Sequence, residues 1–136
     1  MFQPTTPLRV LCADDNAQVL SVLEATLRHA GYSVEVAPDG AAAAAKVKKD
    51  PAHFQLIITD TQMPRLDGFG LVTEARSSGY GGRLIVFVNN LSDEDRAHYH
   101  RLRVDRIIDK PGRAGEMIAA VRDIGASREV LESAVG

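Results

Sequence analysis

The chain has 136 residues, of which 45% are hydrophobic, so it is long enough for one domain with a single core and too short for two. Lys and Arg number 16 and Asp and Glu 18, and the formal net charge of −2 gives no general attraction to nucleic acid or to an anionic membrane. The longest apolar runs, such as Leu84–Val88, are far shorter than the roughly 20 residues of a membrane-spanning helix, so no membrane segment is expected.

Short runs rich in β-forming residues recur along the chain at the spacing of βα units. The predicted strands are Leu8–Ala13, Ser33–Ala37, Phe54–Thr59, Arg83–Val88 and Asp105–Asp109. The third and fourth runs are apolar without alternation, as expected when helices cover both faces of a parallel sheet. The expected fold class is therefore α/β, with an open sheet between two layers of helices.

The segments between the strands carry helix signals. Four helices are predicted to begin after residues whose side chains suit an N-cap, which are Asn16, Asp39, Asp67 and Ser92. The first should end before Gly31, a glycine suited to the C′ position, and the second before Pro51. The apolar stripe of Met117–Ile124 predicts a last helix.

These elements place one domain at residues 8–124, with an N-terminal extension at residues 1–7 and a C-terminal tail at residues 125–136. The extension has neither a basic region nor an apolar stretch, so no secretory signal is expected. The tail is too short for an effector domain. Because Cys12 is the only cysteine, no internal disulfide is possible, and this favours the reducing cytoplasm.

Three carboxylates are expected at the carboxyl ends of two strands. Asp14 and Asp15 directly follow the first strand, and Asp60 directly follows the third. With the strand order 2-1-3-4-5, these ends flank the point where strand order reverses, which is where doubly wound sheets bind ligands. Like charges so close raise each other's pKa unless a cation neutralises them, and Mg²⁺ accepts both carboxylate and phosphate oxygens.

For any single aspartate of this group, a helix cap or a loop residue is the better explanation. The three together favour a site for phosphoryl chemistry. Lys110 supports this hypothesis because it directly follows the fifth strand and brings a positive charge to the same edge of the sheet.

The string Asp60–Gly68 resembles the D-x-x-M-P-x-x-D-G signature of response regulator receiver domains of two-component signalling. Supporting features elsewhere in the chain are Asp14, Asp15, Gly31, Asp39, Gly40, Lys110 and Pro111. The resemblance runs over nearly the whole of residues 8–124. It implies a flavodoxin-like, doubly wound sheet of five parallel strands in the order 2-1-3-4-5, flanked by five helices, in a stand-alone, chemotaxis-regulator-like receiver.

The resemblance also implies roles for individual residues. Asp60 would be the phosphoacceptor, and Lys110 would contact a phosphoryl oxygen. Asp15, Asp60 and the backbone carbonyl of Gln62 would bind Mg²⁺ directly, and Asp14 through a water. The phosphoryl group would come from a histidine kinase or a phosphotransfer protein. The signal would leave by docking to another protein, with no direct contact to nucleic acid or membrane and no enzymatic chemistry beyond self-phosphorylation and autodephosphorylation.

Two of the positions that depart from the pattern of the family belong to its switch. The Thr or Ser that usually ends the fourth strand falls on Val88, or on Asn89 if the register shifts by one residue. Valine has no hydroxyl, so a hydrogen bond to the phosphoryl group worth roughly 1.5–3 kcal/mol would be lost. The usual switch aromatic of the fifth strand falls at Ile107. We hypothesise that phosphate acceptance is intact and that the usual relay to the output face is absent.

The positions that tune hydrolysis of the acyl phosphate in the family are Gln62 and Asn90 here. Two other functions stay open at this point. The first is a receiver-shaped adaptor whose binding ignores phosphorylation, which Val88 and Ile107 favour. The second is a small Mg²⁺-dependent phosphatase or phosphotransferase, which is disfavoured because Gln62 cannot act as a general acid.

Overall fold

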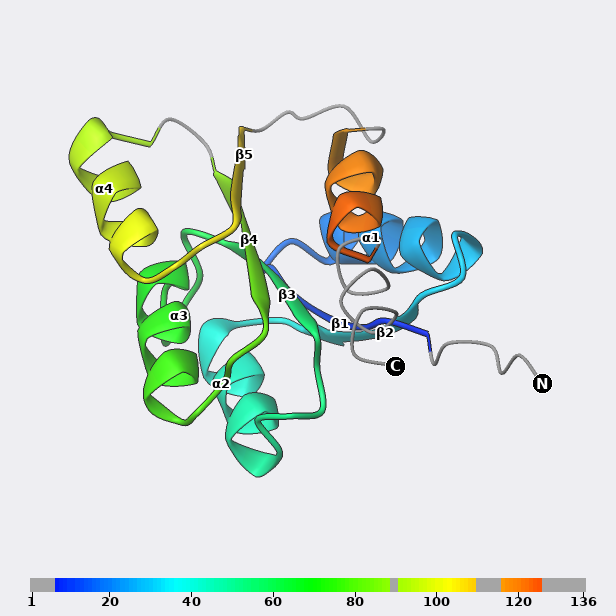
Figure 1. Cartoon of the computed structure of the whole chain (residues 1–136), viewed down its shortest axis with the longest axis horizontal. Helices are drawn as coiled ribbons and strands as arrows, with labels where there is room; N and C mark the ends of the chain where they lie inside the picture. The colour runs from blue at the N-terminus through cyan, green and yellow to red at the C-terminus, as the bar shows by residue number, and fades with distance from the viewer. Residues whose placement is uncertain (1–6, 89–90, 110–115, 126–136) are drawn as a thin grey trace, which may run out of the picture.

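The computed structural model describes residues 7–88, 91–109 and 116–125. An all-parallel sheet of five strands forms its centre (Figure 1). The strands are β1 (Arg9–Ala13), β2 (Ser33–Ala37), β3 (Leu56–Asp60), β4 (Arg83–Val88) and β5 (Arg106–Asp109). They lie in the order β2-β1-β3-β4-β5, which confirms the predicted topology and puts the reversal of strand order between β1 and β3.

Helices connect successive strands, namely α1 (Ala17–His29), α2 (Gly40–Lys49), α3 (Gly68–Ser77) and α4 (Asp93–Arg101). Residues 116–125 form a further helix. The four predicted N-caps are confirmed, since each cap side chain accepts a backbone N–H of its own first turn. Gly31 and Gly79 follow α1 and α3 with φ of 99° and 97°, the left-handed conformation of a C′ glycine. No helix within the described ranges is long and apolar enough to cross a membrane.

The third strand differs from its prediction at both ends. It begins at Leu56, two residues after the predicted Phe54, and it ends at Asp60. Asp60 pairs with Phe87 of β4 and is therefore the last residue of the strand. The expectation that Asp60 comes just after the strand was wrong by one residue, and its backbone is held by the sheet.

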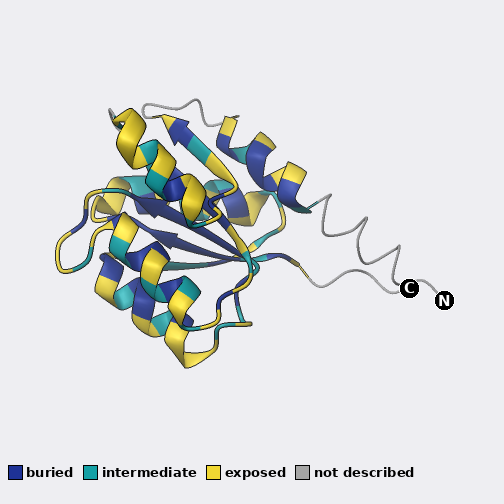
Figure 2. Cartoon of the chain, turned by 60° about the vertical axis from the view of Figure 1, so that its left-hand side comes forward, coloured by how far each residue is buried: buried dark blue, intermediate teal, exposed yellow. Residues whose placement is uncertain are grey.

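Buried apolar residues form a core on each face of the sheet. In Figure 2 the strands and the inward faces of the helices are the buried parts of the ribbon. Along β4, Leu84, Val86 and Val88 contribute to one core, which α2, α3 and α4 cover. Ile85 and Phe87 contribute to the other, which α1 and the helix at residues 116–125 cover. Because helices cover both faces, the apolar strands need no alternation, as the sequence predicted.

Arg76 of α3 forms hydrogen bonds with two loops at the amino end of the sheet. Its guanidinium donates hydrogen bonds of 3.0 and 2.9 Å to the carbonyl oxygens of Tyr80 and Gly82, in the loop before β4. It also donates bonds of 3.1 and 3.0 Å to the carbonyl oxygens of Leu102 and Arg103, after α4. Arg103 has a φ of 63°, a left-handed conformation that follows the C-cap residue Leu102 and ends α4.

Candidate functional site

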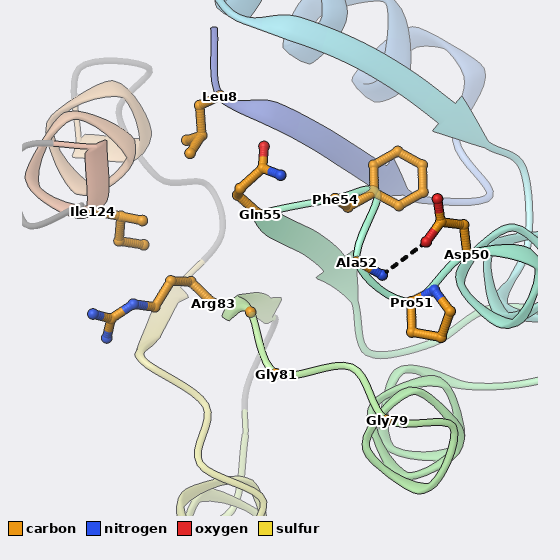
Figure 3. A pocket seen from close by; sticks show the side chains of 11 residues that line it. Leu8, Asp50, Pro51, Ala52, Phe54, Gln55, Gly79, Gly81, Arg83 and Ile124 are labelled. Carbon is orange, nitrogen blue, oxygen red and sulfur yellow. Dashed lines mark hydrogen bonds between the residues drawn. The ribbon is translucent and has the colours of Figure 1, made fainter. Parts of the chain in front are cut away.

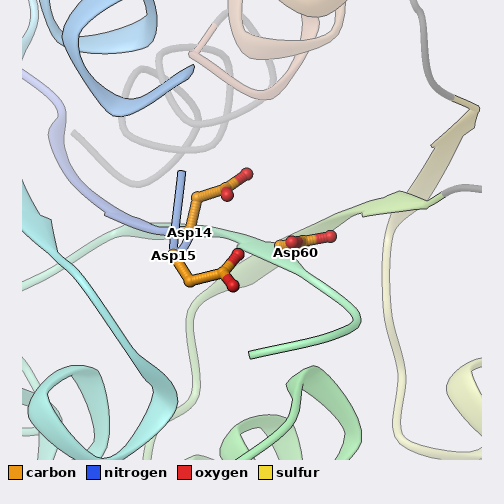
Figure 4. A group of neighbouring side chains, drawn as sticks. All are labelled: Asp14, Asp15 and Asp60. Atoms are coloured by element: carbon orange, nitrogen blue, oxygen red, sulfur yellow. The ribbon is translucent and has the colours of Figure 1, made fainter. Parts of the chain in front are cut away.

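Asp14, Asp15 and Asp60 meet at the carboxyl edge of β1 and β3 (Figure 4). One carboxylate oxygen of each lies within 4.8 Å of those of the other two. Asp14 and Asp60 are only 1% and 8% exposed, whereas Asp15 is exposed. The predicted convergence of the three side chains is therefore confirmed.

The convergence follows from the register of two neighbouring strands. Ala13 of β1 pairs with Thr59 of β3, so the next residue of each chain segment, Asp14 and Asp60, lies at the same edge. The backbone N–H of Asn16 donates a 2.9 Å hydrogen bond to Oδ1 of Asp14, which turns the chain into α1. Asn16 itself caps α1, so capping does not explain Asp14 and Asp15.

The donor set of this site fits a divalent cation. Carboxylate oxygens are the ligands that hard divalent ions prefer, and oxygens as close as these can share one ion. Two of the three groups are buried, where unscreened repulsion between negative charges is costly. The three aspartates can therefore hold a metal ion, and the ion would stabilise their arrangement.

The loop after Asp60 packs tightly against the end of β3. The N–H of Thr61 donates a 2.8 Å hydrogen bond to Oδ1 of Asp60, and the N–H of Gly68 donates one of 2.9 Å to the carbonyl of Thr61. A Cβ at Gly68 would lie 2.2 Å from the carbonyl oxygen of Asp60, so only glycine fits there. Gln62 is exposed on this loop, and Met63 is buried in the core.

A second contact fixes the far end of the same loop to α2. Asp39 caps α2, because its Oδ1 accepts a 2.7 Å hydrogen bond from the N–H of Ala42. Its Oδ2 also lies 3.2 Å from a guanidinium nitrogen of Arg65 and forms an ion pair with it. The backbone of Arg65 is left-handed, with a φ of 72°. A Cβ at Gly40 would lie 2.0 Å from the carbonyl oxygen of Leu66. The sequence predicted Asp39 as a cap and missed its contact with Arg65, since nothing in the local pattern of either residue indicates the other.

Of the two predicted switch positions, one is fully buried in the core and one is partly buried. Val88, the last residue of β4, has no exposed surface, and Ile107 of β5 is partly buried against the same apolar cluster. Neither side chain carries a hydroxyl that a phosphoryl group could attract. The predictions for four other residues lie outside the described residues, namely Asn89, Asn90, Lys110 and Pro111.

A hollow also lies at the amino ends of β1, β3 and β4, at the opposite ends of these strands from Asp14, Asp15 and Asp60 (Figure 3). Its volume is about 580 Å³, and its walls include Leu8, Phe54 and Ile124. Among the described residues that line it, Asp50 is the one carboxylate, and it accepts a hydrogen bond from the N–H of Ala52. The described residues that line the hollow form no cluster of reactive groups, so the chemistry is assigned to the aspartate site.

Comparisons with known proteins show which family the sequence matches. The family model of the response regulator receiver domain matches residues 10–122. The chain is 34% identical over 117 residues to the probable transcriptional regulator ycf27 of Porphyridium aerugineum, covering 85% of this chain and 47% of that protein. It is 32% identical over 115 residues to the response regulator MprA of Mycobacterium leprae (strain TN), covering 85% of this chain and 50% of that protein. The chain thus spans about half the length of these curated relatives.

Solved structures show the same architecture. The Vibrio cholerae chemotaxis protein CheY4 superposes with a TM-score of 0.79 at 28% identity, covering 88% of this chain and 99% of that one. A CheY-like receiver domain protein from Methanospirillum hungatei JF-1 superposes with a TM-score of 0.84, covering 91% of this chain and 98% of that one. Its identity is 22%, so that likeness shows the fold alone.

Proposed function

The chain belongs to the response regulator receiver domain family of two-component signalling, and from this premise we propose that it accepts a phosphoryl group on Asp60 with bound Mg²⁺. The observation that carries the proposal is the meeting of Asp14, Asp15 and Asp60 within 4.8 Å at the carboxyl edge of the sheet. A receiver domain of this kind is a signalling module and not a conventional enzyme.

In the proposed reaction, a carboxylate oxygen of Asp60 attacks phosphorus in line with the leaving group. An O–P bond of an acyl phosphate forms while the P–N bond of a donor phosphohistidine breaks. The donor imidazole leaves with the electron pair of that bond and takes a proton from solvent. Bound Mg²⁺ supplies charge neutralisation for the carboxylates and the phosphoryl oxygens.

The residues around Asp60 have separate tasks in this proposal. Asp15 and the backbone carbonyl of Gln62 hold the ion together with Asp60, and Asp14 acts through a water. Lys110 contacts a phosphoryl oxygen and balances charge. The side chain of Gln62, exposed beside the site, sets how readily water reaches the acyl phosphate.

Tight packing of the loop after β3 supports positioning of the nucleophile. Gly68 touches the backbone of Asp60 on one side, and the Arg65–Asp39 ion pair ties the same loop to α2 on the other. A phosphoacceptor carboxylate must be held close to the geometry in which it attacks phosphorus. Such restraint lowers the entropic part of the activation barrier for phosphoryl transfer.

Membership in a two-component family implies a kinase as partner. We propose that the donor is a histidine kinase or a phosphotransfer protein and that the phosphorylated domain signals by docking to a further protein. A second candidate function is an adaptor whose binding ignores phosphorylation. Burial of Val88 in the apolar core favours it, because no hydroxyl at that position can follow the phosphoryl group.

Mass spectrometry of the intact protein tests the proposed function. Incubation with Mg²⁺ and a small phosphodonor should add the mass of one phosphoryl group to the wild-type chain and to Asp93→Asn, which removes a carboxylate from α4. The adduct should be missing from Asp60→Asn and from reactions treated with a chelator. An adduct that survives Asp60→Asn would contradict the assignment of Asp60 as the phosphoacceptor. No adduct in the wild type would contradict the proposed function and leave the adaptor as the better function.

A further inference from the structure

A pocket of about 350 Å³ lies between the amino end of α3 and α4. Residues 61–62, directly after Asp60, form one wall, and Asp67 and Phe69 of the α3 amino end form the second. Asp95, His98 and Tyr99 of α4 belong to the third. The pocket is thus next to the aspartate site but is built mainly from side chains that phosphoryl transfer does not use.

Aromatic rings line the pocket. Phe69 is 39% exposed, although its ring lies against two others, with its centroid 5.5 Å from that of His98 and 5.9 Å from that of Tyr99. A large apolar ring that is both ordered and open to water is a common feature of a binding surface. Its exposed face can stack against a flat or cationic group.

The hydroxyl of Tyr99 has no hydrogen-bond partner in the described part of the chain, although the residue is only 3% exposed. Buried tyrosine hydroxyls usually have such a partner. No fully buried side-chain oxygen or nitrogen of the described residues lacks one, so this hydroxyl reaches into the pocket that Tyr99 lines. Burial raises the pKa of Tyr99, and the charges of Asp67, Asp95 and Asp60 raise it further.

The pocket is also negatively charged. Asp67 and Asp95 carry no ion pair with any described residue. Asp67 accepts a 2.7 Å hydrogen bond from the N–H of Gly70, and this cap fixes its carboxylate at the pocket edge. Two carboxylates, the hydroxyl of Tyr99 and an open ring together complement a flat cation with several N–H donors.

We propose that this pocket binds an arginine side chain of a partner protein. The guanidinium plane stacks on the ring of Phe69, and its N–H groups donate to the carboxylates of Asp67 and Asp95 and to the hydroxyl oxygen of Tyr99. Arginine fits better than lysine because a guanidinium is planar, stacks on aromatic rings and has five donors in a fixed fork, whereas an ammonium is a point charge.

The position of the pocket also couples it to phosphorylation, and this coupling rests on the proposed function. A phosphoryl group on Asp60 adds one negative charge beside the wall formed by residues 61–62. The added charge should tighten binding of the arginine by about two- to threefold in a water-like dielectric. The signal would then leave by local electrostatics and would need no relay through Val88 and Ile107.

The test is a titration of the full chain with the peptide acetyl-Gly-Arg-Gly-amide, followed by amide chemical shifts into the tens of millimolar range. Saturable shifts are expected at the amino end of α3, in α4 and in the loop after Asp60. The peptide with citrulline, which has the same shape without the charge, and the peptide with lysine should bind more weakly. Asp95→Asn and Tyr99→Phe should each weaken arginine binding by about two- to fivefold.

Asp93→Asn is the matched control, since it removes the same charge from the first turn of α4 outside the pocket lining. The amide spectrum of each variant verifies its fold. The proposal is overturned if citrulline or lysine binds as tightly as arginine, if Asp95→Asn behaves as Asp93→Asn does, or if no saturable shift occurs.

Repeating the titration with phosphodonor separates the two proposals. Arginine-specific binding that does not tighten, in a chain that does gain the phosphoryl mass, contradicts the coupling alone. Binding without any phosphoryl adduct contradicts the proposed function and leaves the pocket assignment intact.

Discussion

Replacing Arg76 by methionine should lower the free energy of unfolding by about 2–4 kcal/mol. One guanidinium donates four hydrogen bonds of 2.9–3.1 Å to carbonyl oxygens in two loops. It also lies 5.6 Å from the centre of the Tyr80 ring. Methionine retains most of the apolar stem, so the change isolates the charged head of the side chain.

The magnitude follows from the number of bonds and their exposure. Each hydrogen bond contributes about 0.5–1.5 kcal/mol net, which gives about 2–6 kcal/mol for the set. The lower half of that range applies because Arg76 is only partly buried, so water can replace some of the lost donors. Arg76→Lys should fall between the wild type and Arg76→Met, since an ammonium cannot reach four divergent carbonyls.

Urea unfolding followed by circular dichroism measures these differences at constant m-value. Arg101→Met is the control, because Arg101 is exposed on α4 and its side chain has no hydrogen bond or ion pair with the described residues. It should change stability by no more than about 0.5 kcal/mol. The reasoning is refuted if Arg76→Met costs no more than Arg101→Met, or if Arg76→Lys is as stable as the wild type.

Three further predictions follow from single contacts. Gly68→Ala should lower the free energy of unfolding by about 1–3 kcal/mol and reduce phosphoryl uptake, because the new Cβ would lie 2.2 Å from the carbonyl oxygen of Asp60. Gly81→Ala is the control in thermal melts and should be neutral, because the space around Gly81 is open. Arg103→Gly should stabilise the domain by about 0.5–1 kcal/mol by removing a left-handed side-chain residue, and an unchanged or lower melting temperature would contradict this. Glu35→Gln should lower the free energy of unfolding by about 0.3–1 kcal/mol at neutral pH, and this difference from the wild type should vanish in acid.

The pH dependence of the last prediction has a definite sign. Partial burial raises the pKa of Glu35, but hydrogen bonds and charges from Lys46 and His53 outweigh burial and hold the pKa below its ordinary value of 4.5. Stability from this carboxylate is therefore present above pH 4.5 and is lost as the pH falls through the lower value of the folded state. Urea unfolding of both proteins across this range should show the difference closing, and a difference that stays constant would be the contrary result.

Local signals accounted for the elements of the fold. Asn16 and Asp39 were predicted as caps because a cap acts on backbone groups only two or three residues away. The aspartate site was predicted for a different reason. Parallel strands put all their carboxyl ends at one edge, so Asp14 and Asp60 had to meet once β1 and β3 were neighbours.

The sequence by itself thus determined the element order, the family signature and the edge at which the three carboxylates gather, because these depend on short-range patterns and on a topological rule. Only the tertiary structure decided the contacts that join distant segments. The bonds from Arg76 to Leu102 and from Arg65 to Asp39 each span 26 residues, and the pocket around Tyr99 requires α3 and α4 to lie side by side. Helix packing sets such contacts, and packing depends on the whole core at once, which no local pattern records.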